Sequence, residues 1–106
     1  MWPFKPAWKS ESEGIAIEAV EEITDEKQLK KIAVKAPYSS VRRSAIVKIA
    51  DLEFLKERAR NDFDKDVRFA AIKKITDKDQ EFFKERARND SDNEIRFAAI
   101  NLNYSY

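Results

Sequence analysis

The chain has 106 residues, of which 39% are charged and 42% hydrophobic, and its formal net charge is +1. This length suits one small domain, and the composition is too apolar for a disordered chain and too charged for a membrane-embedded one. The sequence contains no Cys and no His, which excludes disulfides, thiolate chemistry and the most frequent general base and metal ligand.

Residues 1–14 form an N-terminal arm in which Trp2, Phe4 and Trp8 surround Pro3 and Pro6. Because proline fixes φ and removes a backbone donor, we expect residues 1–10 to be extended rather than helical. The aromatic side chains have two interpretations: they cover the apolar end of the first repeat, or they contact a partner. The arm is too short and too interrupted for a secretory signal, and no run approaches a membrane span, so a cytoplasmic protein is expected.

Seven amphipathic helical patterns follow from residue 15 onward, separated by short polar turns. Aspartate is a favoured N-cap residue, because its carboxylate accepts hydrogen bonds from the free N–H groups of the first helical turn. The aspartates expected to cap helices are Asp25, Asp51, Asp64, Asp77 and Asp92. In the case of Asp77, the cap is suggested by Gln80 three residues later, which completes a capping-box pattern.

A duplication organises the second half of the chain. Residues 56–72, KERARNDFDKDVRFAAI, recur at 84–100 as KERARNDSDNEIRFAAI and differ at four of 17 positions. Helices this short are marginal alone, so repeated units of this kind stack on one another. We therefore predict an all-α fold over 15–106: a short right-handed α-solenoid of three hairpins (about 15–40, 41–66 and 67–94) and a final helix in the half unit 95–106.

The turns of the two copies carry a D-x4-[VI]-R pattern. Asp62 precedes Val67-Arg68, and Asp90 precedes Ile95-Arg96. With the phrases VRFAAIKKITD and IRFAAI, this pattern resembles the HEAT repeat, in the short variant associated with phycobilisome lyases. The resemblance implies a structural ladder of side-chain and backbone bonds along the turns, in which Asp62 pairs with Arg68 and Asp90 pairs with Arg96.

The first unit departs from the family pattern. Ala36 stands where the resemblance would place an aspartate, although Arg42 remains. The resemblance therefore leaves Arg42 without one of the partners that the other ladder arginines are expected to have.

We find no catalytic, cofactor-binding or metal-binding pattern and expect a non-enzymatic protein. Without His or Cys, the Ser and Thr residues lack their usual activator, and phosphate loops need more than the single Gly14. Carboxylate pairs such as Asp64/Asp66 and Asp90/Asp92 are placed to bind a hard cation. Their position in turns that open helices favours capping.

The sequence favours a protein–protein interaction or scaffold module of unknown partner. The candidate partner surface combines aromatic residues, which carry interface energy, with cations of the second helices: Phe63, Phe69, Phe97, Arg60 and Arg88. The uncovered final helix also allows a homo-oligomer.

Two alternatives remain. Nucleic acid would bind a basic ladder along the second helices, made of Arg58, Arg60, Arg86 and Arg88. The resemblance also implies an accessory subunit of a prosthetic-group lyase.

Overall fold

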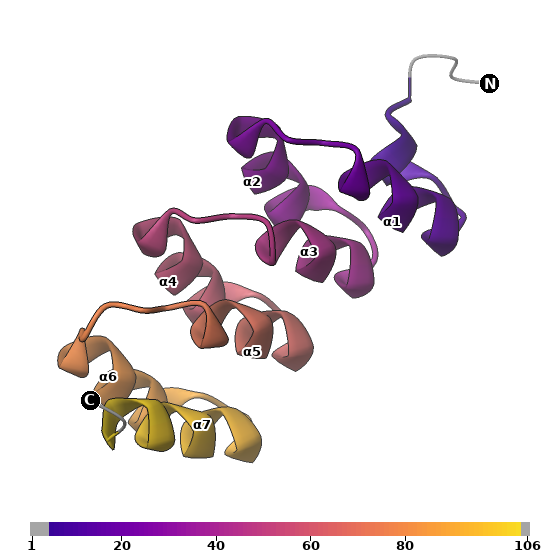
Figure 1. Ribbon diagram of the computed structural model, residues 1–106. Coiled ribbons are helices and arrows are strands. Elements are labelled where there is room, and N and C mark those ends of the chain that lie inside the picture. Colours follow the sequence, from indigo (N-terminus) through magenta and orange to yellow (C-terminus); the bar gives the residue numbers. More distant parts are fainter. Residues whose placement is uncertain (1–4, 105–106) are drawn as a thin grey trace. The chain divides into compact units, whose positions relative to one another are not determined.

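The computed structural model describes residues 5–104 (Figure 1), so Trp2 and Phe4 of the predicted arm lie outside the described residues. Within this range the chain is all-helical, with seven α-helices and no strand, which confirms the predicted all-α class and the number of helices. It divides into two compact units, Met1–Ala50 and Asp51–Tyr106. No helix among the described residues is both long and apolar enough to cross a membrane.

Unit 1 contains a short 3-10 helix, η1 (Ala7–Lys9), and the helices α1 (Glu13–Glu21), α2 (Glu26–Lys35) and α3 (Ser39–Ile46). Helix α3 packs against both α1 and α2. The side chains between them are fully buried, among them Val20, Ile32, Val41 and Ile46. The Lys48 ammonium donates to the carbonyls of Val20, Glu21 and Ile23 at 3.0, 3.0 and 2.5 Å, and so satisfies the carbonyls left free at the end of α1.

The described part of the N-terminal arm is not fully extended. Ala7–Lys9 forms a helical turn that packs on α1, with Pro6 as its N-cap, so the expected extended conformation is wrong for these residues. Proline restricts its own φ and the residue before it, but leaves the following residues free to turn. The turn buries the Trp8 indole, which is only 7% exposed, against unit 1.

Unit 2 contains α4 (Leu52–Asn61), α5 (Lys65–Lys73), α6 (Gln80–Asn89) and α7 (Asn93–Tyr104). The most closely packed neighbours in this unit are α4 with α5 and α6 with α7. Helices α4 and α6 form one layer of this unit, and α5 and α7 form the other (Figure 1). The core between the layers is apolar and fully buried, and includes Leu55, Val67, Ile72, Phe83 and Ile95.

The predicted caps hold for four of the five aspartates. Asp25, Asp51, Asp64 and Asp92 accept backbone hydrogen bonds in the first turns of α2, α4, α5 and α7. The prediction for Asp77 is wrong, because α6 begins at Gln80 and its cap is Asp79, whose carboxylate accepts from the Phe82 N–H at 3.1 Å. Asp77 instead binds the Lys56 ammonium at 2.8 Å.

Candidate interaction surfaces

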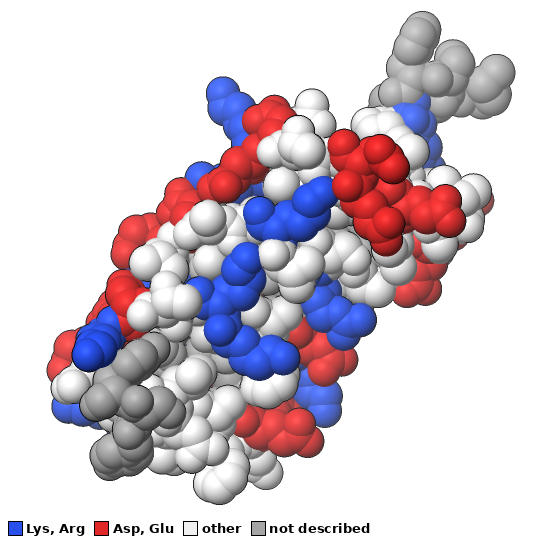
Figure 2. Space-filling model, viewed as in Figure 1, with Lys and Arg blue, Asp and Glu red and all other residues white. Residues whose placement is uncertain are grey.

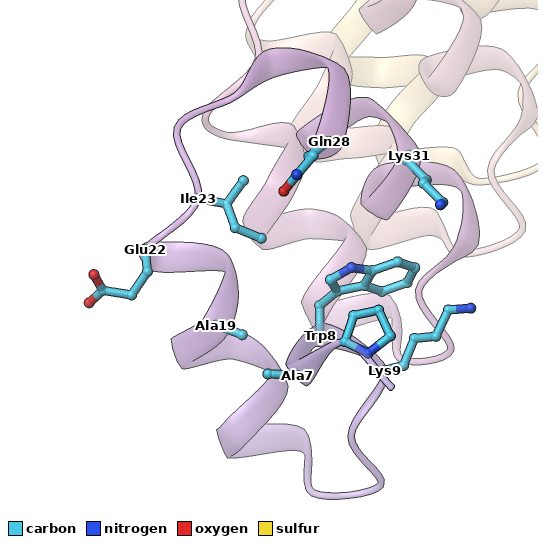
Figure 3. Close-up of a pocket in the computed structure, with 9 residues that line it drawn as sticks. Ala7, Trp8, Lys9, Ala19, Glu22, Ile23, Gln28 and Lys31 are labelled. Carbon is cyan, nitrogen blue, oxygen red and sulfur yellow. The ribbon is translucent and has the colours of Figure 1, made fainter. Parts of the chain in front are cut away.

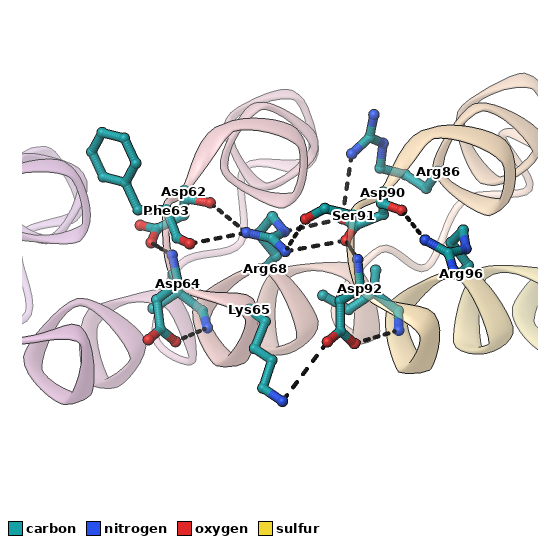
Figure 4. Close-up of polar contacts among 12 residues, drawn as sticks. Asp62, Phe63, Asp64, Lys65, Arg68, Arg86, Asp90, Ser91, Asp92 and Arg96 are labelled. Carbon is teal, nitrogen blue, oxygen red and sulfur yellow. Dashed lines mark hydrogen bonds and ion pairs between the residues drawn. The ribbon is translucent and has the colours of Figure 1, made fainter.

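Arg68 connects the turn between α4 and α5 with the turn between α6 and α7 (Figure 4). Its Nη1 donates to the main-chain carbonyls of Asp62 at 2.9 Å and Phe63 at 3.1 Å. Its Nε and Nη2 donate to the two carboxylate oxygens of Asp90 at 3.0 and 3.1 Å. Arg68 therefore bonds its own turn through carbonyls and the following turn through a bidentate ion pair, a geometry that suits the planar guanidinium.

Asp90 lies at the centre of this network and is buried. Besides Arg68, it binds Arg86 Nη1 at 3.4 Å and accepts from the Asp92 N–H at 2.9 Å. Arg96 donates to the Asp90 carbonyl at 2.6 Å, as Arg68 does to that of Asp62. Within its own turn, each of these arginines therefore binds a main-chain carbonyl, a group that every residue type has.

This geometry explains how the first unit tolerates Ala36. Arg42 Nη1 donates to the Ala36 carbonyl at 2.9 Å, the same kind of contact that Arg68 makes with Asp62. The alanine therefore preserves the bond within the turn, because that bond does not use the aspartate side chain.

Lys56 is a buried cation of α4. Its side chain is 5% exposed, and Nζ binds Asp77 at 2.8 Å and Asp79 at 2.9 Å. The hydrogen bonds to Asp77 and then to Asp79 raise the pKa of Lys56 above its ordinary value of 10.5. The hydrogen bond from Lys56 is the main cause that lowers the pKa of Asp79 below 3.8. A buried ammonium is tolerated here because two carboxylates surround it.

We expect Lys56→Met to lower the free energy of unfolding at pH 7 by about 1–3 kcal/mol. The loss is moderate because Asp77 and Asp79 are about one-third exposed and water screens them. Urea denaturation across pH measures the difference from wild type. The raised pKa of Lys56 stabilises the fold below pH 10.5 and ceases to do so at higher pH, and the lowered pKa of Asp79 stabilises it above pH 3.8. The difference in unfolding free energy between wild type and Lys56→Met should therefore become smaller at very low and very high pH. A difference that does not change with pH would contradict the ion-pair explanation.

The structure corrects the basic ladder. Arg58 and Arg86 are buried, and each is bound by the preceding glutamate and by the aspartate of its turn. Arg60 is exposed, but its Nε binds Glu85 at 3.0 Å and its guanidinium lies 4.9 Å from the centre of the Phe82 ring. Only Arg88 of the four is exposed without an acidic side chain bound to it among the described residues.

The three candidate aromatic residues differ in exposure. Phe63, in the turn after α4, is 99% exposed, which confirms its predicted surface position, and Phe97 on α7 is 66% exposed. Phe69 is half-buried on α5, with the Lys73 ammonium 4.8 Å from its ring centre. Arg60 contacts Phe82 and Glu85 of α6. The five candidate residues therefore lie on different elements and differ in exposure.

A groove between α6 and α7 was missed from the sequence. Its volume is about 250 Å³, and it is lined by Phe83, Lys84, Ala87, Arg88, Ile100 and Asn103. Ile100 is 40% exposed and lies three residues after Phe97, so these two share a face of α7. The duplication could have indicated this groove. Ala87 and Ile100 correspond to Ala59 and Ile72 of the preceding copy, and both of those residues are fully buried.

Unit 1 has a larger cavity of about 520 Å³, beside the Trp8 indole (Figure 3). Ala19 and Ile23 of the α1 segment line it, together with Gln28 and Lys31 of α2. Its lining holds one carboxylate, Glu22, and no pair of groups suited to acid–base chemistry. In the described part of the chain, no cluster of acidic residues has the spacing of a metal site.

Comparisons with models of known protein families, with curated proteins and with solved structures found no match for this chain.

Proposed function

We propose that this chain is a non-enzymatic protein-interaction module, built as a short α-solenoid of HEAT-like hairpins. The solenoid is supported by unit 2, where the sequence of one hairpin recurs in the next and the two are bonded in register. Arg60 binds Glu85 and Arg68 binds Asp90, 25 and 22 residues further along the chain. Contacts of this kind between successive copies are what a stacked repeat needs.

The observation that carries the interaction function is the apolar surface of α7. Phe97 is 66% and Ile100 40% exposed, and Ile100 borders the α6–α7 groove. Single exposed apolar residues are common, but an aromatic and an aliphatic residue beside a groove form the anchor-and-pocket arrangement of protein interfaces. A partner that covers them would remove this apolar area from water.

Nucleic-acid binding is the less favoured alternative. Arg58 and Arg86 are already neutralised by buried carboxylates, so the positive charge left on the second helices is small. Acidic side chains also gather over α1, whose residues Glu13, Glu18 and Glu21 have no basic neighbour in that helix (Figure 2). A backbone-binding protein instead needs a continuous basic face.

The test is affinity capture from the native lysate with the tagged 106-residue chain, with and without nuclease. We expect a stoichiometric protein that survives nuclease, with retention reduced about tenfold by Phe97→Ala, as for an interface anchor. Ile15→Ala, which truncates an exposed residue of α1, serves as the matched control and should retain the partner. Recovery of nucleic acid alone, lost on addition of salt, would overturn the proposal.

A further inference from the structure

One surface of the α4–α5 hairpin is covered by the hairpin that follows it. Two cations lie on this surface, and each has an acidic partner there: Lys56 binds Asp77 and Asp79, and Arg60 binds Glu85. Phe82 of α6 packs beneath the Arg60 guanidinium. The apolar residues of the covered surface are all buried: Leu55, Ala59, Ile72 and Ile75. This surface therefore binds a helix that combines carboxylates with an aromatic side chain.

The same surface recurs 28 residues later, where no element of residues 5–104 covers it. The equivalent residues are Phe83, Lys84, Ala87, Arg88, Ile100 and Asn103, which are the residues that line the α6–α7 groove. Lys84 and Arg88 are exposed, and no acidic side chain among residues 5–104 is bound to either. Arg96 repeats the bond of Arg68 to its own turn, but not the bidentate pair that Arg68 makes with Asp90. The second surface keeps both cations and most of the apolar floor, with Asn103 in place of Ile75. Within the described chain it has no counterpart of α6.

We propose that the α6–α7 groove binds an acidic amphipathic helix of a partner protein, which occupies the place that α6 takes on the α4–α5 hairpin. The inference rests on the proposed interaction function and specifies the partner. The pattern that the groove requires is an acidic residue at the helix N-cap, an aromatic residue three positions later and a glutamate six positions later. These are the positions of Asp79, Phe82 and Glu85 in α6.

Besides α6, a second copy of this chain offers the required pattern in α4, at Asp51, Phe54 and Glu57. A dimer or longer assembly of the protein in size-exclusion chromatography, abolished by Lys84→Glu/Arg88→Glu, would therefore overturn the choice of a different chain.

The other helices of a second copy do not fit the groove. Its α6 is unavailable, because Phe82 and Phe83 are buried within unit 2. In α2 the positions that correspond to Phe82 and Glu85 are occupied by Gln28 and Lys31, and a lysine opposite Arg88 would be repelled. If the grooves of two copies faced each other, Lys84 and Arg88 of one copy would meet the same cations of the other and repel them. Charge complementarity therefore favours a different, acidic chain.

The probe for the test is a fluorescein-labelled peptide with the sequence of residues 77–90. In the peptide, Arg88 is replaced by glutamate, and a lactam between Lys84 and this glutamate holds the peptide helical; both positions are exposed in the folded chain. Fluorescence polarisation measures its binding to the 106-residue protein. We expect saturable binding that is weakened about tenfold by the double variant Lys84→Glu/Arg88→Glu. The matched control is Lys27→Glu/Lys35→Glu, which reverses two exposed lysines of α2 and should leave binding unchanged.

A second peptide, with Asp79→Asn and Glu85→Gln, keeps the shape and the apolar face but removes two carboxylates. It should bind at least several-fold more weakly than the acidic peptide, and the difference should shrink as salt is added. Absence of saturable binding, or equal affinity for both peptides, would overturn the inference. A lysate partner that is retained equally by wild type and Lys84→Glu/Arg88→Glu would also overturn it while leaving the interaction function intact. Failure to retain any protein would instead reject the proposed function.

Discussion

Asp90→Ala is expected to lower the free energy of unfolding by about 3–5 kcal/mol, because it removes the carboxylate that pairs with the buried Arg68 guanidinium and one of the two carboxylates bound to the buried Arg86. Arg68 and Arg86 are both buried and both bind Asp90 Oδ2, at 3.0 and 3.4 Å. The substitution also removes the acceptor of the Asp92 N–H. Urea denaturation followed by far-UV circular dichroism measures the loss, which is a large fraction of the stability of a domain of this size.

The matched control for Asp90→Ala is Glu18→Ala, which deletes an exposed carboxylate of α1 and should change stability by less than about 0.5 kcal/mol. Asp79→Ala is not a neutral control, because Asp79 caps α6 and binds Lys56. In a double-mutant cycle, Arg68→Ala and Asp90→Ala should be non-additive, with a coupling of about 1–3 kcal/mol. Additive effects would show that the two side chains do not act as a pair.

Phe83→Ala is expected to destabilise the protein by about 3–5 kcal/mol, through lost apolar burial and the cavity that remains. The Phe83 ring is fully buried and packs edge-on against Phe82, with ring centres 5.5 Å apart and an interplanar angle of 69°. Because Phe83 also forms the floor of the α6–α7 groove, truncation extends the groove into the core. Thermal and urea unfolding both measure the loss.

Phe83→Leu is the matched control, because Leu29 and Leu55 occupy the equivalent position in the preceding repeats and are buried there. A leucine fills most of the space, so we expect a cost below about 1.5 kcal/mol. If Phe83→Leu were as damaging as Phe83→Ala, the aromatic contact with Phe82 would matter more than the filled volume. In that case the equivalence of the three positions would not extend to packing.

Local sequence determined the helices of this protein. The period of apolar residues predicted seven helices, and the aspartates at the starts of α2, α4, α5 and α7 are caps because a short carboxylate reaches the N–H groups of the first turn. The duplication predicted that equivalent residues of unit 2 share their environment, and this is correct for the apolar positions Leu55 and Phe83. These features depend on neighbours within about one helical turn or on a repeat that the sequence displays directly.

The sequence did not predict which charged side chains pair with each other between successive hairpins. Asp77 and Asp79 lie two residues apart before α6, and both are competent caps by composition. Asp79 caps the helix and also binds Lys56, while Asp77 binds Lys56 alone among the contacts described. The pairing of Arg68 with Asp90 rather than with the Asp62 carboxylate likewise depends on how one turn lies against the next.

Lys56 and Lys84 show most clearly the difference between what the local sequence determines and what the tertiary structure decides. Both stand in the identical local sequence KERARND, so composition, helix propensity and side-chain spacing treat them alike. Lys56 is 4% exposed because the α6–α7 hairpin covers it and supplies two carboxylates, whereas Lys84 is exposed beside an open groove. The sequence alone therefore determined that both lysines lie on a helix. Burial and charge pairing depend on the element packed above each one, and only the tertiary structure decided which lysine is a buried ion and which is exposed.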